Sequence, residues 1–371
     1  MRHLIPVLHT RVILSLMTLV TLSSLLYFLP DPRSFLPPLP TCDSSDPKNA
    51  IPNYVHYVYI LPESHDGFDF RFSHFLSIYA AWYYWRPDTI YLHTNVRDHG
   101  EEVSQAREGR AGKWSKMIFT LFDLRIRTVD VPSHAGNGVE IKNMEHKSDF
   151  VRVKAVYELG GIYIDWDVHP LRDIKILRQS GFRAVAGRQM DNQVNSGTFM
   201  SVRHGKMVKL WMNRMNIVYD GGWTTHSNEV ITSCGQQLVR EAGEMLIMER
   251  DAFAPGSWTN KDTDALFGFR GESSNPANVN EGDALPALDE TLSDRWDNPD
   301  KLPDWAHDWS HTYLLHAFSP DRWKHQVFGF ENITPQYILN QTSNFALATY
   351  PIASHLYANG LIRSEDTYTG R

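Results

Sequence analysis

The sequence predicts an α/β fold with a mainly parallel central sheet, preceded by one transmembrane helix. Apolar, strand-like runs alternate with segments of helical length from residue 54 onwards, a pattern that favours a parallel sheet covered on both faces. An uncharged apolar run over residues 12–29 has the length of a short membrane-spanning helix. With 371 residues, 42% of them apolar, the chain is long enough for one large domain or two smaller ones.

Charge and cysteine content exclude several other classes of protein. The net charge of −7 argues against nucleic acid as the main partner, because duplex binding favours a basic face. Two cysteines, Cys42 and Cys234, exclude a disulfide-stapled scaffold and any CxxC zinc site.

The N-terminal 50 residues predict a membrane anchor. Residues 1–11 contain Arg2 and Arg11 and form a cytoplasmic tail, since basic residues stay on the cytoplasmic side. No A-x-A cleavage pattern follows the apolar run over 12–29, which favours an uncleaved signal anchor over a signal peptide. Residues 30–50 are rich in proline and predict an extended stem. Cys42 lies in that stem, either as a free thiol or as a cross-link between two stems.

This order predicts a single-pass type II protein of the Golgi or endoplasmic reticulum membrane, with the remaining residues, 51–371, in the lumen. The short apolar run suits the thinner membranes of the early secretory pathway. Two sequons, at Asn332 and Asn340, are compatible with a lumenal glycoprotein.

The strands and helices follow from apolar patterning and from glycine and proline punctuation. In the first half we expect strands at 54–61, 89–93, 126–131 and 162–165, and helices at 72–85, 114–124 and 149–159. In the second half we expect strands at 184–186, 198–202 and 312–318, helices at 206–218 and 228–242, and a mixed tail at 335–357. Residues 260–303 are rich in polar residues, glycine and proline and predict a long loop or insertion.

Two aspartates at the end of the strand over 162–165 form the first candidate site. Asp165 and Asp167 are two residues apart, so in extended chain both carboxylates point the same way and Trp166 points to the other side. Ligands gather outside the carboxyl ends of parallel strands, and oxygen ligands suit Mn²⁺ or Mg²⁺. The alternative is two solvated aspartates in a turn.

The helix before this strand carries the second part of the candidate site. Asp149 and Arg152 are three residues apart and share one helix face. Arg152 is suited to hold a phosphate or sugar oxygen, and Asp149 to accept sugar hydroxyls. Gly160 and Gly161 let the chain reverse tightly and bring that face near Asp165. The alternative is a surface ion pair that favours the helix N-terminus.

The run S-D-x-x-R followed by G-G-x-Y-x-D-x-D resembles the sugar-binding DXD region of glycosyltransferase family 32, which includes fungal mannosyltransferases and animal α-1,4-galactosyltransferases. The matching residues, spread over 20 positions, are Ser148, Asp149, Arg152, Gly160, Gly161, Tyr163, Asp165 and Asp167. Ile51-Pro52 with His56 resembles the opening strand of the family, and Asn195-Ser196-Gly197 resembles its next block. At position 53, asparagine replaces the usual lysine of the opening strand.

The resemblance implies a GT-A type domain that uses a nucleotide-diphosphate sugar and retains the anomeric configuration. It implies Asp167 as a direct metal ligand, Asp165 as a ligand through water or a contact of the ribose, and Tyr57 and Val58 as contacts of the nucleotide base. Tyr163 either holds a phosphate or packs in the core. Asp191 and Asn195 are candidates for groups beneath the anomeric carbon.

A third metal ligand is expected from late in the chain. The candidates are His316 and His311, with His169 a weaker one; a buried structural histidine is the alternative for His316. Four tryptophans are candidates for stacking on acceptor sugars, although core packing is the alternative: Trp223, Trp258, Trp305 and Trp309.

Together these features predict a hexosyltransferase that depends on Mn²⁺ or Mg²⁺ and moves a hexose from a GDP- or UDP-sugar to a glycan or glycolipid. The alternatives are a lumenal sugar-binding protein without catalysis and an inactive subunit of a transferase complex.

Overall fold

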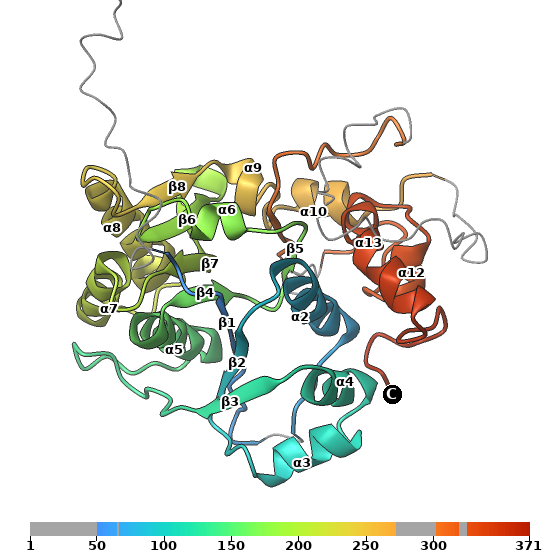
Figure 1. The fold of residues 1–371 in the computed structure, drawn as a ribbon, viewed down its shortest axis with the longest axis horizontal. Helices are drawn as coiled ribbons and strands as arrows, with labels where there is room; N and C mark the ends of the chain where they lie inside the picture. The colour runs from blue at the N-terminus through green and yellow to red at the C-terminus, as the bar shows by residue number, and fades with distance from the viewer. Residues whose placement is uncertain (1–49, 65–66, 272–301, 319–324) are drawn as a thin grey trace, which may run out of the picture. The chain divides into compact units, whose positions relative to one another are not determined.

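A central mixed sheet organises the computed structural model, which describes residues 50–64, 67–271, 302–318 and 325–371 (Figure 1). Among these residues the strand order is β3-β2-β1-β4-β7-β6-β8. The strands are β1 (Tyr54–Val58), β2 (Thr89–Thr94), β3 (Leu124–Thr128), β4 (Gly161–Ile164), β6 (Ala184–Arg188), β7 (Val194–Ser201) and β8 (Leu246–Met248).

The pairing confirms the prediction of a mainly parallel sheet. β3, β2, β1 and β4 run parallel to one another, and β8 is parallel to β6. β7 runs antiparallel to both β4 and β6. Only the short segment 189–193 joins β6 to β7, and a parallel return would need a much longer crossover, so these two strands pair antiparallel.

Alternate residues of the strands feed two hydrophobic cores, one on each face of the sheet. Val55 and Ile164 belong to one core, whereas Tyr163 and Phe199 belong to the other. The first core is covered by α2 (Phe72–Trp85), α4 (Lys113–Leu121) and α13 (Asn344–Ala358), and the second by α5 (Met144–Leu159), α7 (Lys206–Val218) and α8 (Val230–Leu238) (Figure 1). The prediction of a sheet covered on both faces is confirmed.

A small second sheet joins distant parts of the chain. β5 (Val168–Pro170) follows the predicted D-x-D pair directly and pairs antiparallel with β9 (Leu314–His316). This pairing brings the late strand, which the sequence predicts at 312–318, beside the aspartates.

Several helices differ from the sequence-based expectation. α5 begins at Met144, five residues before the predicted start, so residues 145–148 also lie on this helix. The prediction of a loop over 260–303 is wrong at its start, because Asn260–Phe267 forms α10, capped by the Thr259 side chain, which accepts a hydrogen bond from the Asp262 amide. The shorter helices are α3 (Glu101–Glu108), α6 (Lys175–Arg178), α9 (Arg250–Phe253) and α12 (Pro335–Leu339).

The predicted tail and anchor over 1–29, the stem apart from residue 50, Cys42 and most of the predicted loop lie outside the described residues. In the part of the chain that is described, no helix combines the length and apolar character needed to cross a membrane. Cys234 is a buried free cysteine.

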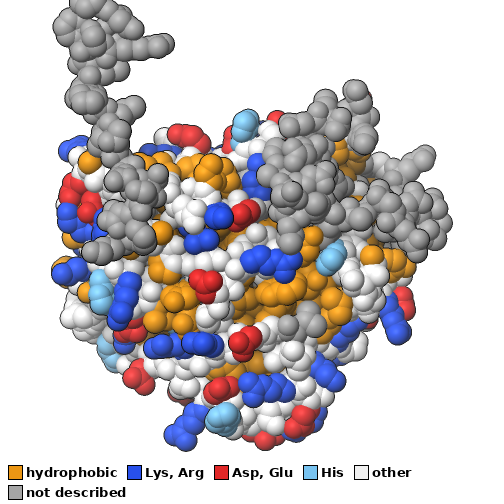
Figure 2. All heavy atoms as spheres, viewed as in Figure 1, with side chains coloured by type: hydrophobic (Ala, Val, Ile, Leu, Met, Phe, Trp, Pro, Cys, Tyr) orange, Lys and Arg blue, Asp and Glu red, His pale blue; other side chains and the backbone are white. Residues whose placement is uncertain are grey.

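On the face seen in Figure 2, lysine and arginine side chains lie between aspartates and glutamates. Where the described residues are visible on this face, both signs of charge lie side by side.

Candidate active site

A tight reversal between α5 and β4 positions the helix against the strand. Gly160 and Gly161 have φ angles of +70° and +111°, which disfavour any residue with a Cβ atom. A Cβ atom on Gly160 would lie 2.6 Å from the Arg203 amide nitrogen, and one on Gly161 would lie 2.5 Å from the Tyr54 carbonyl oxygen. His56 Nε2 donates to the Gly160 carbonyl at 2.8 Å and ties β1 to the same turn.

The two aspartates lie in a turn just beyond β4. β4 ends at Ile164, one residue before the predicted end, and the Val168 amide donates to the Asp165 carbonyl at 3.1 Å. The Asp165 amide donates to the Gly197 carbonyl on β7 at 2.8 Å. The chain is therefore turned at Asp165–Asp167 and not extended, yet the two carboxylates still converge.

His316 completes the cluster because of the register of the small sheet. Val168 on β5 lies opposite His316 on β9, and the Ala317 amide donates to the Asp167 carbonyl at 2.9 Å. Single ligand atoms from Asp165, Asp167 and His316 all lie within 4.8 Å of one another. Within the described residues this is the one such group.

The other two histidine candidates do not join this cluster. His311 is exposed before β9, and His169 is 1% exposed with its ring edge-on to Phe345. The preference for His316 as the third metal ligand agrees with its position beside Asp165 and Asp167.

The three residues fit a divalent cation. Two carboxylates and an imidazole suit Mn²⁺, and the carboxylates alone suit Mg²⁺. The space beside them depends on Gly197, since a Cβ atom there would lie 2.6 Å from Asp165 Oδ2 and 2.7 Å from His316 Cε1. A side chain at position 197 would fill the cradle in which an ion would sit.

Asn195 supports the cluster from below and does not line the cavity. It is 1% exposed, its Oδ1 accepts from the Gly197 amide at 2.6 Å, and its Nδ2 therefore faces His316 Nδ1 at 2.8 Å. Because an amide nitrogen only donates, Nδ1 carries the lone pair and the neutral ring holds its proton on Nε2, toward Asp167. Asn195 therefore acts on the site through His316.

Arg152 lies at the centre of a buried network of polar side chains. Its Nη1 donates to Asp165 Oδ1 at 3.2 Å, and its Nη2 lies 2.6 Å from Asp149 Oδ1 and 2.9 Å from Ser196 Oγ. Arg152 is 5% exposed, which contradicts the alternative of a surface ion pair. Burial opposes the charge, but Asp149 and Asp165 raise the pKa of Arg152 above its ordinary value.

Tyr163 holds Asp165 from the other side. Its hydroxyl donates to Asp165 Oδ1, and its ring is buried against Phe199. Burial, followed by the charge of Asp165, raises the pKa of Tyr163 well above the ordinary value, so the hydroxyl keeps its proton. The buried ring agrees with the core-packing reading of Tyr163, and the contact with a phosphate stays a prediction.

A single π-helical turn, η4 (Thr225–Glu229), supplies residues that the sequence analysis missed. His226 Nε2 lies 2.7 Å from Asp149 Oδ2, and Ser196 Oγ donates to Asn228 Oδ1 at 3.0 Å. π-turns often occur at functional sites, but their sequences carry no recognisable signal.

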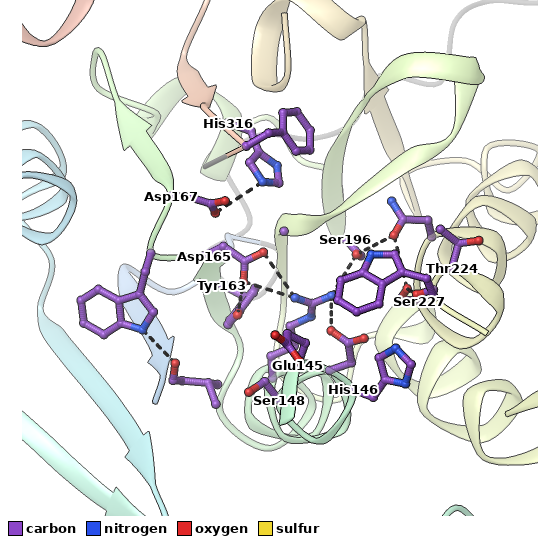
Figure 3. A pocket seen from close by; sticks show the side chains of 18 of the residues that line it. Glu145, His146, Ser148, Tyr163, Asp165, Asp167, Ser196, Thr224, Ser227 and His316 are labelled. Atoms are coloured by element: carbon purple, nitrogen blue, oxygen red, sulfur yellow. Dashed lines mark hydrogen bonds and ion pairs between the residues drawn. The ribbon is translucent and has the colours of Figure 1, made fainter. Parts of the chain in front are cut away.

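These groups surround one cavity of about 500 Å³, a size typical of small-molecule sites (Figure 3). It is lined by Val58, His74, Glu145, His146, Ser148, Asp149, Arg152, Tyr163, Asp165, Trp166, Asp167, Gln189, Ser196, Gly197, Trp223, Thr224, Ser227, Asn228, Trp258, His316 and Phe318. Of the predicted tryptophans, Trp223 and Trp258 line the cavity, whereas Trp305 and Trp309 do not.

Two predicted substrate contacts do not reach the cavity. Tyr57 is fully buried, with its hydroxyl 3.2 Å from Ser77 Oγ and its ring against Trp166. Asp191 is exposed in a left-handed conformation, and Gln189 lines the cavity in its place. Val58 does line the cavity, but its carbonyl accepts a hydrogen bond from the Trp166 indole at 2.8 Å.

The sequence segment around the D-x-D pair matches a known family. Residues 91–183 match the model of the glycosyltransferase sugar-binding region containing DXD motif. The resemblance of this segment to glycosyltransferases is thereby confirmed, while the assignment to family 32 stays a prediction. No curated protein sequence matches the chain.

Solved structures with a distant likeness are also glycosyltransferases. PaToxG glycosyltransferase shares 13% identity over 52% of this chain and 72% of its own, with a TM-score of 0.36. Apo-form GlyE of Streptococcus pneumoniae TIGR4 shares 10% identity over 84% of this chain and 64% of its own, with a TM-score of 0.38. With TM-scores below 0.5, the family match and the geometry of the site remain the support for function.

Proposed function

We propose that the protein is a hexosyltransferase that moves a hexose from a nucleotide-diphosphate sugar to a glycan or glycolipid acceptor and depends on Mn²⁺ or Mg²⁺. The observation that carries the proposal is the convergence of Asp165, Asp167 and His316 on one wall of a cavity whose adjoining wall presents Asp149 and Arg152. The match to a glycosyltransferase sugar-binding region supports glycosyl transfer as the activity.

The cluster would bind the diphosphate end of the donor. Asp165, Asp167 and His316 would hold the cation, which when bound neutralises the diphosphate and so assists its departure. Arg152 and Tyr163 both hydrogen-bond Asp165, so they fix the carboxylate that faces the cation. Such supporting contacts orient the ligands of metal sites.

The α5 side of the cavity would bind the hexose. Asp149 is a carboxylate 7% exposed, held by Arg152 and His226, and its position on the cavity wall suits acceptance of sugar hydroxyls. Charge-assisted hydrogen bonds of this kind are strong and directional. The same two partners leave Asp149 poorly placed to act as a nucleophile, which supports substitution on the face that the diphosphate leaves, with retention of configuration.

The site would act in the lumen of the Golgi or endoplasmic reticulum. The uncharged run over 12–29, with basic residues before it, supports a type II anchor. Glycan and glycolipid acceptors are found in that compartment.

A donor screen tests the proposal. The full-length chain, purified in detergent, is incubated with Mn²⁺ and GDP-mannose, UDP-galactose, UDP-glucose or UDP-N-acetylglucosamine, and released nucleoside diphosphate is measured. We expect release from one donor above all others and its loss with EDTA. A sugar-binding protein without catalysis would release nothing from any donor, and a nucleoside diphosphate with Mn²⁺ would not raise its melting temperature.

A further inference from the structure

One rim of the cavity carries a large exposed aromatic side chain. This rim, formed by Glu145, His146, Trp223 and Thr224, lines the same cavity as the metal-binding cluster. Trp223 is 53% exposed, although its ring is among the largest apolar surfaces that a side chain offers. An exposed tryptophan at the edge of a cavity is suited to a ligand with one apolar face.

A buried nitrogen in the same rim lacks a hydrogen-bond partner. His146 is 1% exposed, and its Nδ1 lies 3.0 Å from the Tyr219 hydroxyl. Its Nε2 has no partner among the described residues. Leaving a buried polar atom without a partner is unfavourable, so this atom favours a ligand that supplies one. The rings of His146 and Trp223 lie 5.3 Å apart, centroid to centroid, which lets one ligand meet both.

The rim lies at the opposite end of the cavity from the cluster. Figure 3 shows His146 and Thr224 on one side and Asp167 and His316 on the other. Between them Arg152 contacts Asp165 and Asp149, Asp149 contacts His226, and the His226 ring lies 4.5 Å from that of His146. A hexose beside Asp149 would therefore also lie beside the rim.

The chemistry of the rim favours an uncharged sugar. Its members offer an indole face, a carboxylate from Glu145, an imidazole and a hydroxyl, and no cationic lysine or arginine. Burial, with help from the neighbouring His226, lowers the pKa of His146, so its ring stays neutral near pH 7. A pyranose matches this set because it has an apolar C–H face for stacking and a ring of hydroxyls for hydrogen bonds.

We infer that this rim is the acceptor subsite and that it binds a neutral terminal pyranose, stacked on Trp223 and hydrogen-bonded through a hydroxyl to His146 Nε2. The inference rests on the proposed function, since it names the acceptor class for the same cavity. Trp223 and His146 are thereby specificity-determining residues for transfer.

The test separates binding of the acceptor from binding of the donor. The full-length wild type, Trp223→Ala, His146→Gln and the control Phe328→Ala, whose aromatic ring is 81% exposed outside the cavity, are compared. The probes are methyl α-D-mannopyranoside, methyl β-D-galactopyranoside and methyl β-D-glucopyranoside. Their binding is followed by saturation-transfer NMR, and transfer to them is followed by product formation. Donor hydrolysis without any glycoside is measured in parallel.

We expect Trp223→Ala and His146→Gln to weaken binding of the accepted glycoside at least tenfold, while donor hydrolysis stays within twofold and the control behaves as wild type. An equal loss of donor hydrolysis would place the rim in the donor site. Unchanged glycoside binding in the variants, or no glycoside binding by a wild type that hydrolyses donor, would overturn the inference. Wild type that hydrolyses no nucleotide sugar would instead be a failure of the proposed function.

Discussion

His316 Nε2 lies 3.4 Å from Asp167 Oδ1, although Asp167 lies in the turn before β5 and His316 on β9, far apart in the sequence. The contact follows from the register of β5 and β9, which sets His316 opposite Val168. The register also explains how a late histidine joins two early aspartates, because the small sheet serves to close one end of the cavity.

Gly197→Ala is expected to preserve the fold and remove cation binding. The new Cβ atom would meet the ends of the Asp165, His316 and Asn195 side chains and no backbone atom, so these side chains would have to shift. Those side chains would then leave the cradle. Isothermal titration with Mn²⁺ should show at least tenfold weaker binding, with a melting temperature close to that of wild type. Wild-type affinity for Mn²⁺ would contradict this use of Gly197.

Arg152→Lys is expected to lower both activity and stability. A lysine keeps the charge but loses the fork that contacts Asp149, Asp165 and Ser196 together. We expect transfer to fall about tenfold or more, which corresponds to about 1.4 kcal/mol. Arg152→Ala would remove a partner of the buried Asp149 carboxylate and of the half-buried Asp165 carboxylate, and should destabilise the fold by about 3–5 kcal/mol. An exposed pair, such as Lys154 with Glu158, provides the control, since Lys154→Ala should change the free energy of unfolding by about 1 kcal/mol or less.

Kinetics and urea unfolding of these variants check that prediction. Wild-type stability in Arg152→Ala would show that the buried network contributes little. Wild-type transfer in Arg152→Lys would show that the charge alone is enough at this position.

Acid is expected to destabilise the protein between about pH 6.5 and 4. His93 Nε2 lies 3.0 Å from His56 Nδ1, and His56 Nε2 donates to Gly160, so the two buried rings cannot both be protonated. Burial lowers the pKa of His56 to about 4 and that of His93 well below 6.5. The unfolded chain therefore binds more protons in this window, and stability rises with pH by about 1.4 kcal/mol per unit for each histidine.

Urea unfolding across pH 4–8 measures that slope. His93→Leu should reduce it, whereas the control His99→Gln, at an exposed position, should leave it unchanged. A free energy of unfolding that is flat from pH 6.5 to 4 would contradict the prediction.

The domain is expected to lie in the lumen. In intact microsomes a C-terminal tag should resist protease until detergent is added, because basic residues precede the apolar run over 12–29. Digestion of the tag without detergent would show the opposite topology.

Local sequence patterns predicted most helices and strands and four residues of the candidate site. α2 and α7 have the bounds that their apolar runs and flanking residues indicate, and the spacing of Asp149, Arg152, Asp165 and Asp167 placed all four at one cavity. These features depend on residues close in sequence, for which helix and strand periodicity is a direct guide.

The site residues that the sequence did not predict depend on packing between distant parts of the chain. Tyr57 has a strand position that suits a nucleotide contact, but Trp166 covers it, and nothing in a single strand reveals such a neighbour. Asn228 lines the cavity from the π-turn and His146 from an extra turn of α5, whereas His226 in the π-turn contacts Asp149 behind the cavity wall. A search for polar residues one helical turn before Asp149 would have found His146, whereas η4 has no comparable signal.

Release of nucleoside diphosphate by Asp167→Asn tests the central claim most directly. Asparagine keeps the size of the side chain and removes the negative charge that the cation needs, so the fold should survive. With the donor that the wild type prefers and saturating Mn²⁺, we expect release to fall at least a hundredfold, while the melting temperature without Mn²⁺ stays within a few degrees of wild type. Wild-type turnover in Asp167→Asn, undiminished by EDTA, would contradict a role for this carboxylate and its cation in glycosyl transfer.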